Sequence, residues 1–282
     1  MRLLRLGNAF GAVRAGVMIL GVLAVGLAQP AAAGKRADGA KIGRAPDFEW
    51  SGKVARGGSV EIRGVNGGIV AEPTTGDQVE VTAIKTANRS DPDEVKIALS
   101  TRPDGITICT VYTDRSGNEP TDCSSESSWH SHTHNNDVSV EYHVKLPAGV
   151  RFVARTVNGA IEARRLGAAI KAETVNGSVN VSTSDAAEAE TVNGSIRAEI
   201  GSSRWSDPIE LKTVNGSIRV LLPPDVGAEV RAATMNGDIE TDFPLTVRGR
   251  IGGRHLSGTL GKGGGSLRLE NVNGGISIIA SK

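Results

Sequence analysis

Thr174-Val175-Asn176-Gly177-Ser178-Val179 is one copy of a six-residue stretch that recurs through the second half of this 282-residue sequence. Further copies begin at Thr156, Thr191, Thr213, Thr234 and Asn271, and a related stretch occurs upstream at Val65-Asn66-Gly67-Gly68-Ile69. The asparagines of the six copies are 17 to 22 residues apart, except for a last gap of 37 residues. We interpret Leu256-Ser257-Gly258-Thr259-Leu260, which lies inside that gap, as a degenerate seventh copy. Recurrence at such a spacing predicts a repeat architecture.

Each copy contains the signals of a sharp corner followed by a strand. Asn-Gly tolerates positive φ, which lets the chain turn abruptly. The residues that follow alternate between apolar and polar, as in Val179-Asn180-Val181, and this alternation predicts a half-buried strand. Two all-β architectures fit these signals. One is a β-solenoid, similar to a single-stranded β-helix, whose coils stack about 4.8 Å apart. The other is an antiparallel β-meander in which Asn-Gly forms type I′ hairpin turns.

The sameness of the copies favours the β-solenoid, because stacking puts equivalent residues of successive coils above one another. We expect registered T-V-N-G-S-I coils in which asparagine side-chain amides hydrogen-bond from coil to coil. This structural ladder would contain Asn158, Asn176, Asn193, Asn215, Asn236 and Asn273. One apolar column would contain Val157, Val175, Val192, Val214, Met235 and Val272, and a second would contain Ile161, Val179, Ile196, Ile218, Ile239 and Ile276.

The composition agrees with a narrow, stacked interior. The chain has 36 glycines, and Phe, Trp and Tyr together make up only 3% of it. The glycines lack the strict three-residue period of collagen, and 39% hydrophobic residues argue against wholesale disorder. Modules that stack nucleic-acid bases need exposed aromatic residues in number, so we do not expect nucleic acid as a partner. A narrow coil interior accepts Val, Ile, Ala and Leu but not rings, which accounts for the few aromatic residues.

Residues 1–33 have the features of a secretory signal peptide. Arg2, Arg5 and Arg14 come before an uncharged apolar run at 15–27, and Ala31-Ala32-Ala33 offers a cleavage site. The run is shorter than the about 20 residues of a membrane span. We therefore expect export to the periplasm or cell envelope, or beyond the cell, with no integral span in the mature chain. A signal segment retained as an anchor is the alternative.

The mature chain would be nearly neutral, since it would carry 29 basic and 31 acidic residues. This balance predicts no bulk attraction to nucleic acid or to anionic membranes. We expect a flexible leader at 34–47, an irregular β entry section at 48–150 and regular β-solenoid repeats at 151–282. The entry section contains Cys109 and Cys123, the only two cysteines. In an oxidising compartment a disulfide between them is the leading interpretation, and two unpaired thiols are the alternative.

Three histidines alternate in the entry section, at His130, His132 and His134. On an extended strand this alternation puts them on one face, where neutral imidazoles could hold Zn²⁺ or Cu²⁺ with Asp137 or His143 as a further ligand. Neighbours on one face of a strand are about 6.5 to 7 Å apart, a distance that suits two ligands better than three. The surrounding Ser, Asn and Asp residues favour an exposed polar loop. We therefore expect no cofactor, with a secondary zinc or copper site as the alternative.

The repeats also resemble a known group of proteins. The T-V-N-G-S-I corners, the upstream Val65-Asn66-Gly67-Gly68-Ile69 copy and the alternating strand that leads into Leu146-Pro147-Ala148-Gly149 are similar to the bacterial putative-adhesin family, a domain of unknown function. The resemblance covers residues 50–280. It implies a β-strand-repeat protein of the envelope, and it implies neither an enzymatic activity nor an agreed ligand.

These features favour a secreted, non-catalytic protein that presents a rigid ribbed surface to an envelope polysaccharide or protein. A structural or envelope-stress accessory protein without an external ligand is the alternative, and a polysaccharide-acting enzyme is less favoured. Such enzymes need paired carboxylates and aromatic platforms for sugar rings. Here the glutamates are scattered relative to the corners, and Trp50, Trp129 and Trp205 are isolated in the sequence. We therefore assign no catalytic residue.

Overall fold

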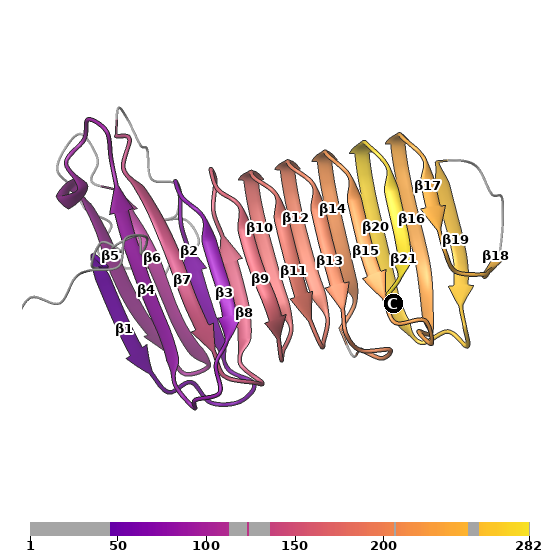
Figure 1. Cartoon of the computed structure of the whole chain (residues 1–282), viewed down its shortest axis with the longest axis horizontal. Coiled ribbons are helices and arrows are strands. Elements are labelled where there is room, and N and C mark those ends of the chain that lie inside the picture. Colours follow the sequence, from indigo (N-terminus) through magenta and orange to yellow (C-terminus); the bar gives the residue numbers. More distant parts are fainter. Residues whose placement is uncertain (1–45, 113–122, 124–135, 206, 248–253, 282) are drawn as a thin grey trace, which may run out of the picture. The chain divides into compact units, whose positions relative to one another are not determined.

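The structure is a computed structural model that describes residues 46–112, 123, 136–205, 207–247 and 254–281, all within one compact unit at 44–282. The expected signal peptide at 1–33 lies outside the described residues, as does nearly all of the expected leader. The described chain is all-β and forms two large mixed sheets (Figure 1). In the part of the chain that the structure covers, no helix has the length and apolar character needed to cross a membrane.

Sheet A contains, in spatial order, β1 (Phe48–Gly52), β4 (Val79–Thr86), β7 (Ser139–Leu146), β3 (Ile69–Pro73), β9 (Ile161–Leu166), β11 (Val179–Thr183), β13 (Ile196–Ile200), β15 (Ile218–Leu222), β21 (Ile276–Ala280) and β17 (Ile239–Thr241). Sheet B contains β18 (Leu245–Val247), β19 (His255–Leu260), β16 (Ala228–Asn236), β20 (Gly265–Asn273), β14 (Ile209–Asn215), β12 (Ala187–Asn193), β10 (Ile170–Asn176), β8 (Arg151–Arg155), β2 (Ser59–Arg63), β6 (Gly105–Tyr112) and β5 (Val95–Arg102).

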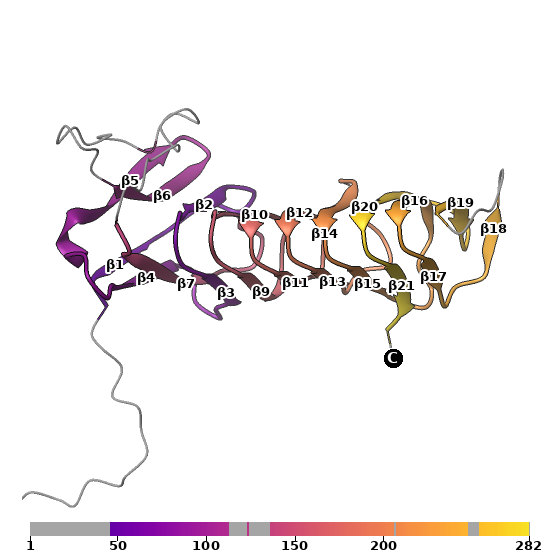
Figure 2. The ribbon, with the colours of Figure 1, turned by 90° about the horizontal axis from the view of Figure 1, so that it is seen from above.

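The core lies between the two sheets, which face each other as two rows of strands when the unit is seen from above (Figure 2). Each strand turns alternate residues inward: in β13, Ile196, Ala198 and Ile200 are buried while Arg197 and Glu199 are exposed. The predicted isoleucine column is confirmed from Ile161 to Ile276, and only its member in the end strand β17, Ile239, is partly exposed. Small and branched side chains fill most of the space between the sheets. The expectation that this interior excludes rings is wrong toward the entry section, where Tyr142 of β7 and Phe152 of β8 are fully buried in the same core.

The repeat copies pair in parallel and in register. From β9 to β16 the chain alternates between the two sheets, so that each strand lies beside a strand one repeat away. In sheet B, Thr174 of β10 pairs with Thr191 of β12, which pairs with Thr213 of β14. Stacked coils require parallel pairs of this kind. Antiparallel pairs, as in hairpins, occur toward the ends of the sheets, for example between β5 and β6 and between β18 and β19.

The stacking order departs from the order along the chain. β14 pairs with β20, and β20 pairs with β16, so the copy at Asn273 is inserted between the copies at Asn215 and Asn236. The interpretation of Leu256–Leu260 as a seventh stacked copy is therefore wrong: this segment belongs to β19, which pairs antiparallel with β16. The long gap in the sequence holds the β18–β19 hairpin, which reverses the chain before it returns as β20. Upstream, Asn66 lies beside Asn158 as a further rung.

The entry section continues the same two sheets. β2 pairs in parallel with β8, and β3 with β9, so both join the stack. β6 is buried on both faces, because Cys109 on its outer face forms the predicted disulfide with Cys123. The two cysteines pack against Val111 and Ala98 in a small cluster outside the main core. This bond ties Cys123 to the outer face of sheet B.

Candidate binding surface

The corners of the repeats are held by threonine hydroxyls that the sequence analysis overlooked. The threonine that opens each copy points inward, and its Oγ1 donates a hydrogen bond to the glycine carbonyl of the neighbouring copy. The Oγ1 to carbonyl oxygen distance is 2.9 Å from Thr174 to Gly159, 2.9 Å from Thr191 to Gly177 and 2.8 Å from Thr213 to Gly194. In the inserted copy, Asn271 replaces threonine, and its Nδ2 donates to the Gly216 carbonyl over 2.8 Å. The sequence does indicate that this threonine points inward, because its position is in phase with the inward residues of each strand.

Replacing Thr191 with valine should lower the free energy of unfolding by about 1–2 kcal/mol. Valine keeps the shape and burial of the side chain but removes the donor to the Gly177 carbonyl, and losing one partner of a buried hydrogen bond costs about this much. Urea denaturation measures the effect. Thr191→Ser retains the hydroxyl and serves as the control, so an equal loss of stability in both variants would contradict the proposed role of the hydrogen bond.

The glycines of the corners are required by the closeness of neighbouring copies more than by turn geometry. A Cβ on Gly194 would lie 2.0 Å from the Gly177 carbonyl oxygen, and one on Gly177 would lie 2.0 Å from that of Gly159. Among the corner glycines, φ falls clearly in the left-handed region at Gly67 (118°) and Gly274 (137°). In the other copies the tolerance of Asn-Gly for positive φ is therefore not what requires the glycine; the packing of neighbouring backbone excludes a side chain there.

The asparagine side chains form a continuous row on the surface at these corners. Each Nδ2 donates to the Oδ1 of the asparagine in the adjacent rung, at 2.8 or 2.9 Å. The bonds run from Asn158 to Asn66, Asn176 to Asn158, Asn193 to Asn176, Asn215 to Asn193, Asn273 to Asn215 and Asn236 to Asn273. The structure thus brings together all six predicted asparagines, adds Asn66, and puts Asn273 before Asn236.

The residue before each asparagine forms an apolar row on the outer side of the corners. We call it the valine row, and it contains Val175, Val192, Val214, Met235 and the partly buried Val272. Solvent reaches 37% of Val175, 38% of Val192, 38% of Val214 and 63% of Met235. The prediction of an apolar column is right about the alignment, but its members lie outside the core, and only Val157, which is partly buried, packs against it. A strand has a two-residue period, so an inward threonine turns the next residue outward. This leaves apolar side chains in solvent at the corners, along the C-terminal ends of the strands of sheet B.

Two charged rows accompany the valine row on the outer face of sheet B. In spatial order from β10 to β16, the first contains Glu173, Glu190, Lys212, Glu270 and Ala233, and the second contains Lys171, Glu188, Glu210, Arg268 and Arg231. At the centre, Lys212 Nζ lies 2.9 Å from Glu210 Oε2, and Arg268 Nε lies 2.7 Å from Glu270 Oε1. The hydrogen bond from Lys212 lowers the pKa of Glu210, and that bond raises the pKa of Lys212 in turn. β14 and β20 therefore carry a checkerboard of four charges.

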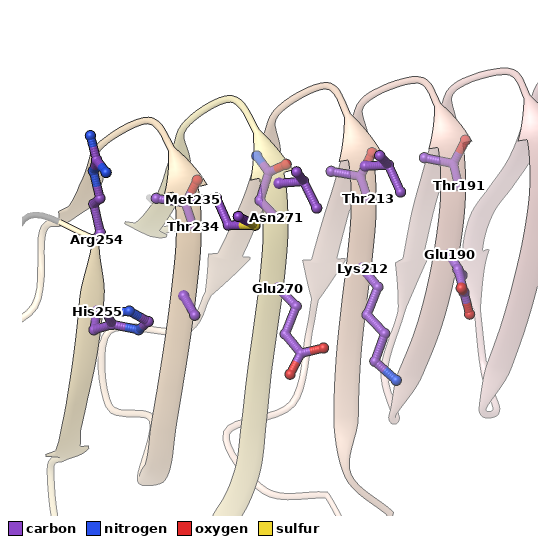
Figure 3. Close-up of a pocket in the computed structure, with 13 residues that line it drawn as sticks. Glu190, Thr191, Lys212, Thr213, Thr234, Met235, Arg254, His255, Glu270 and Asn271 are labelled. Atoms are coloured by element: carbon purple, nitrogen blue, oxygen red, sulfur yellow. The ribbon is translucent and has the colours of Figure 1, made fainter.

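A groove of about 540 Å³ lies along this face. Figure 3 shows Glu190, Lys212 and Glu270 side by side along it, with Arg254 and His255 at the other end from Glu190. Val214, Val272 and Met235 of the valine row also line it. The groove thus combines aliphatic side chains with charges of both signs, and no Phe, Tyr or Trp occurs among the described residues that line it. We take the outer face of sheet B, from β10 to β16, as the candidate binding surface.

A second polar feature is a buried cluster of charges on the outer face of sheet B, next to Cys123. The carboxylate of Glu61 accepts hydrogen bonds from Arg63 Nε at 2.8 Å and from Arg102 at 3.3 Å, and Arg155 Nε lies 3.5 Å away. Glu61 and Arg63 are 4% and 5% exposed, and Arg63 also donates a hydrogen bond to the Cys123 carbonyl. Burial acts to raise the pKa of Glu61, but the arginines outweigh it and the pKa is lowered. The cluster links the entry section to the stack and has a structural character.

The predicted metal ligands His130, His132 and His134 lie outside the described residues. Of the further candidates, the Asp137 carboxylate accepts hydrogen bonds from the backbone N–H groups of Ser90, Arg89 and Asn88, which lower its pKa. His143 lies 3.5 Å from Glu141 on the outer side of sheet A. Within the ranges that the structure describes, no group of three His, Cys, Asp or Glu residues is arranged to hold a metal.

Neither a protein-family model nor a curated protein sequence matches this chain. Two solved structures show a distant similarity to the chain. A putative cell adhesion protein from Clostridium sporogenes is 11% identical, with 84% of this chain and 100% of that chain covered and a TM-score of 0.46. A putative adhesin from Bacteroides fragilis is 10% identical, with 83% and 96% covered and a TM-score of 0.25. These values are too low to bear on function, which has to be read from the residues of the chain itself.

Proposed function

We propose that this protein is an exported, non-catalytic binding protein of the cell envelope, with β-solenoid repeats that present the outer face of sheet B to another macromolecule. The observation that carries the proposal is the valine row, five aligned apolar side chains on an open face. A contiguous exposed apolar patch bordered by polar residues is typical of an interaction site. Here the patch is bordered by the charged rows on one side and by the asparagine row on the other.

The backbone beneath the surface favours recognition. The valine row is carried by parallel strands in fixed register, and threonine and asparagine side chains tie each corner to the next. A surface that is already ordered loses little conformational entropy when a partner binds. Apolar residues at the centre with charged residues around them are also the usual composition of a protein interface. These features support an adhesin-like or surface-presenting role.

The groove favours a protein partner over a polysaccharide. Sugar rings usually stack on aromatic side chains, whereas the described lining of the groove is aliphatic and charged. The charges on this face also differ from those of a hydrolytic site. Glu210 is bonded to Lys212 and its pKa is lowered, whereas a carboxylate that acts as a general acid needs a raised pKa. Export is supported by the features of residues 1–33 and by the Cys109–Cys123 disulfide.

Affinity capture from a cell-envelope extract tests this function. We expect the purified protein to retain a defined envelope polypeptide, identified by mass spectrometry, and the double variant Val192→Ser, Val214→Ser to lose it. The two valines are exposed, so their replacement should leave the fold intact. Val70→Ser, on the outer side of sheet A, is the matched control and should retain the component. Retention of nothing above the blank resin, or equal retention by the double variant, would rule the proposal out.

A further inference from the structure

We infer that the partner of the outer face of sheet B is a second copy of this chain, turned over about a two-fold axis that runs parallel to the strands and passes between β14 and β20. This inference rests on the proposed binding role of that face. It is carried by the order of the charges in the two charged rows, which is fixed by the register of the strands.

The checkerboard on β14 and β20 is complementary to itself when it is turned over. Such a rotation keeps each row opposite the same row of the second copy but reverses the order of the strands. Lys212 then faces Glu270 of the second copy, and Glu210 faces Arg268 of the second copy. By symmetry the same two pairs form again in the other direction, as an interface between identical faces requires. Four pairs of opposite charge thus surround the axis.

The strands on either side of the checkerboard, β12 and β16, extend the charge complementarity. β12 faces β16 of the second copy, so Glu188 lies opposite Arg231 and Glu190 lies opposite the uncharged Ala233. Moving the axis by one strand either way breaks this pattern. Between β12 and β14, Glu188 faces Glu210; between β20 and β16, Arg268 faces Arg231. An axis over β14 itself puts Lys212 opposite Lys212 of the second copy. Like charges opposite one another disfavour an interface, so the order of the charges selects this axis among those that run parallel to the strands.

Rotation about the same axis also puts apolar side chains of the valine row opposite one another. Val214 faces Val272 of the second copy, and Val192 faces Met235 of the second copy. Met235 is the most exposed of these side chains, at 63%, and it would enter the partner's groove near Glu190 and Thr191, which line the groove at its β12 end. Each copy would thus insert one methionine into the other. The pairing covers the apolar residues that are otherwise left in solvent.

The size of the face indicates a reversible dimer. Five strands from β10 to β16, each with about seven residues, span roughly 550 Å² per copy at the usual strand spacing and residue rise. Specific interfaces of standard size bury about 800 Å² per partner. We therefore expect an association that depends on protein concentration and weakens as added salt screens the charges.

Half-inverted variants test the axis directly. The first, Glu210→Lys with Lys212→Glu, exchanges the charges on β14; the second, Arg268→Glu with Glu270→Arg, exchanges those on β20. Each keeps the ion pair within its own strand but puts like charges opposite one another across the axis. In sedimentation velocity, wild-type protein should dimerise, and each half-inverted variant alone should dimerise at least about tenfold more weakly. A mixture of the two should recover dimers, because every facing pair is again of opposite charge.

The control is the corresponding exchange on the exposed face of β13, Arg197→Glu with Glu199→Arg, which should dimerise like wild type. If a half-inverted variant proves unstable in thermal melts, the fully inverted variant with all four exchanges replaces it. That variant should associate with itself but not with tagged wild-type protein. A monomeric wild type at all concentrations, undiminished dimerisation of the half-inverted variants, or no recovery in the mixture of folded variants would overturn the inference.

These results are separable from the capture experiment. A monomeric protein that still retains an envelope component through the valine row would leave the proposed function standing and remove the self-association. A dimer that depends on the checkerboard, in a protein that retains no other component, would support self-association and remove a heterologous envelope partner.

Discussion

Replacing Gly194 with alanine is expected to lower the free energy of unfolding by roughly 3 kcal/mol. The added Cβ would lie 2.0 Å from the Gly177 carbonyl oxygen, well inside van der Waals contact, and the obstructing atom belongs to the backbone of the neighbouring copy. That backbone is held on both sides, by the hydrogen bond from Thr191 to Gly177 and by the asparagine row. The clash therefore has to be relieved by separating two stacked copies, an extreme case of overpacking.

Urea denaturation of Gly194→Ala beside Gly201→Ala measures this effect. At Gly201, which follows the end of β13, the nearest atom to an added Cβ is the Thr183 carbonyl oxygen at 3.6 Å, an ordinary contact. Alanine there should change stability by less than about 0.5 kcal/mol. If the two substitutions had the same small effect, the copies could not be stacked as closely as the structure has them.

The second large effect is expected for Glu61→Gln, which should lower the free energy of unfolding by about 3–5 kcal/mol at neutral pH. The variant removes the one carboxylate that Arg63, Arg102 and Arg155 share. Removing one partner of a buried ion pair leaves uncompensated buried charge, which costs about this much. Glu162→Gln, at the exposed pair with Arg164, is the matched control and should cost less than about 1 kcal/mol. Equal losses in the two variants would contradict the importance of burial.

Wild-type protein and Glu61→Gln should also differ in how their stability responds to acid. The arginines lower the pKa of Glu61 in the folded protein below its ordinary value of 4.5. Its contribution is therefore fully present above that value and is lost as the pH falls through the lower folded-state pKa. The stability difference between wild type and Glu61→Gln should shrink as the pH falls below about 4. Urea titrations at a series of pH values measure it, and a difference that grew toward acid would have the wrong sign.

The sequence predicts the local features of the repeats well. Alternation after each Asn-Gly identifies the strands, and the recurrence of isoleucine identifies the column that fills the core. The asparagine row could be anticipated because an amide is both donor and acceptor and can bond to an identical neighbour. Cys109 and Cys123 could be paired because no other cysteine competes. All of these predictions depend on residue type and spacing alone.

The remaining features depend on the phase of the strands and on contacts between distant segments. The alternation of each strand puts the corner threonine inward and the valine outward, but the acceptor of the threonine hydroxyl belongs to the neighbouring copy and is not marked in the sequence. Pairing of β14 with β20 joins Asn215 to Asn273, and the chain between them carries no local mark of the insertion. The cluster around Glu61 unites residues from three strands, β2, β5 and β8, with the backbone of Cys123. Such contacts become visible only when the strands are assembled.

The stacking order can be tested by trapping neighbouring positions of the valine row with engineered disulfides. Because β20 lies between β14 and β16, positions 214 and 272 should be in adjacent rungs about 4.8 Å apart, and positions 214 and 235 should be two rungs apart. A disulfide spans the first distance but not the second. We predict that Val214→Cys with Val272→Cys forms the new disulfide, detected by peptide mass spectrometry, while Val214→Cys with Met235→Cys does not. The reverse result would contradict the stacked, inserted arrangement on which the binding surface depends.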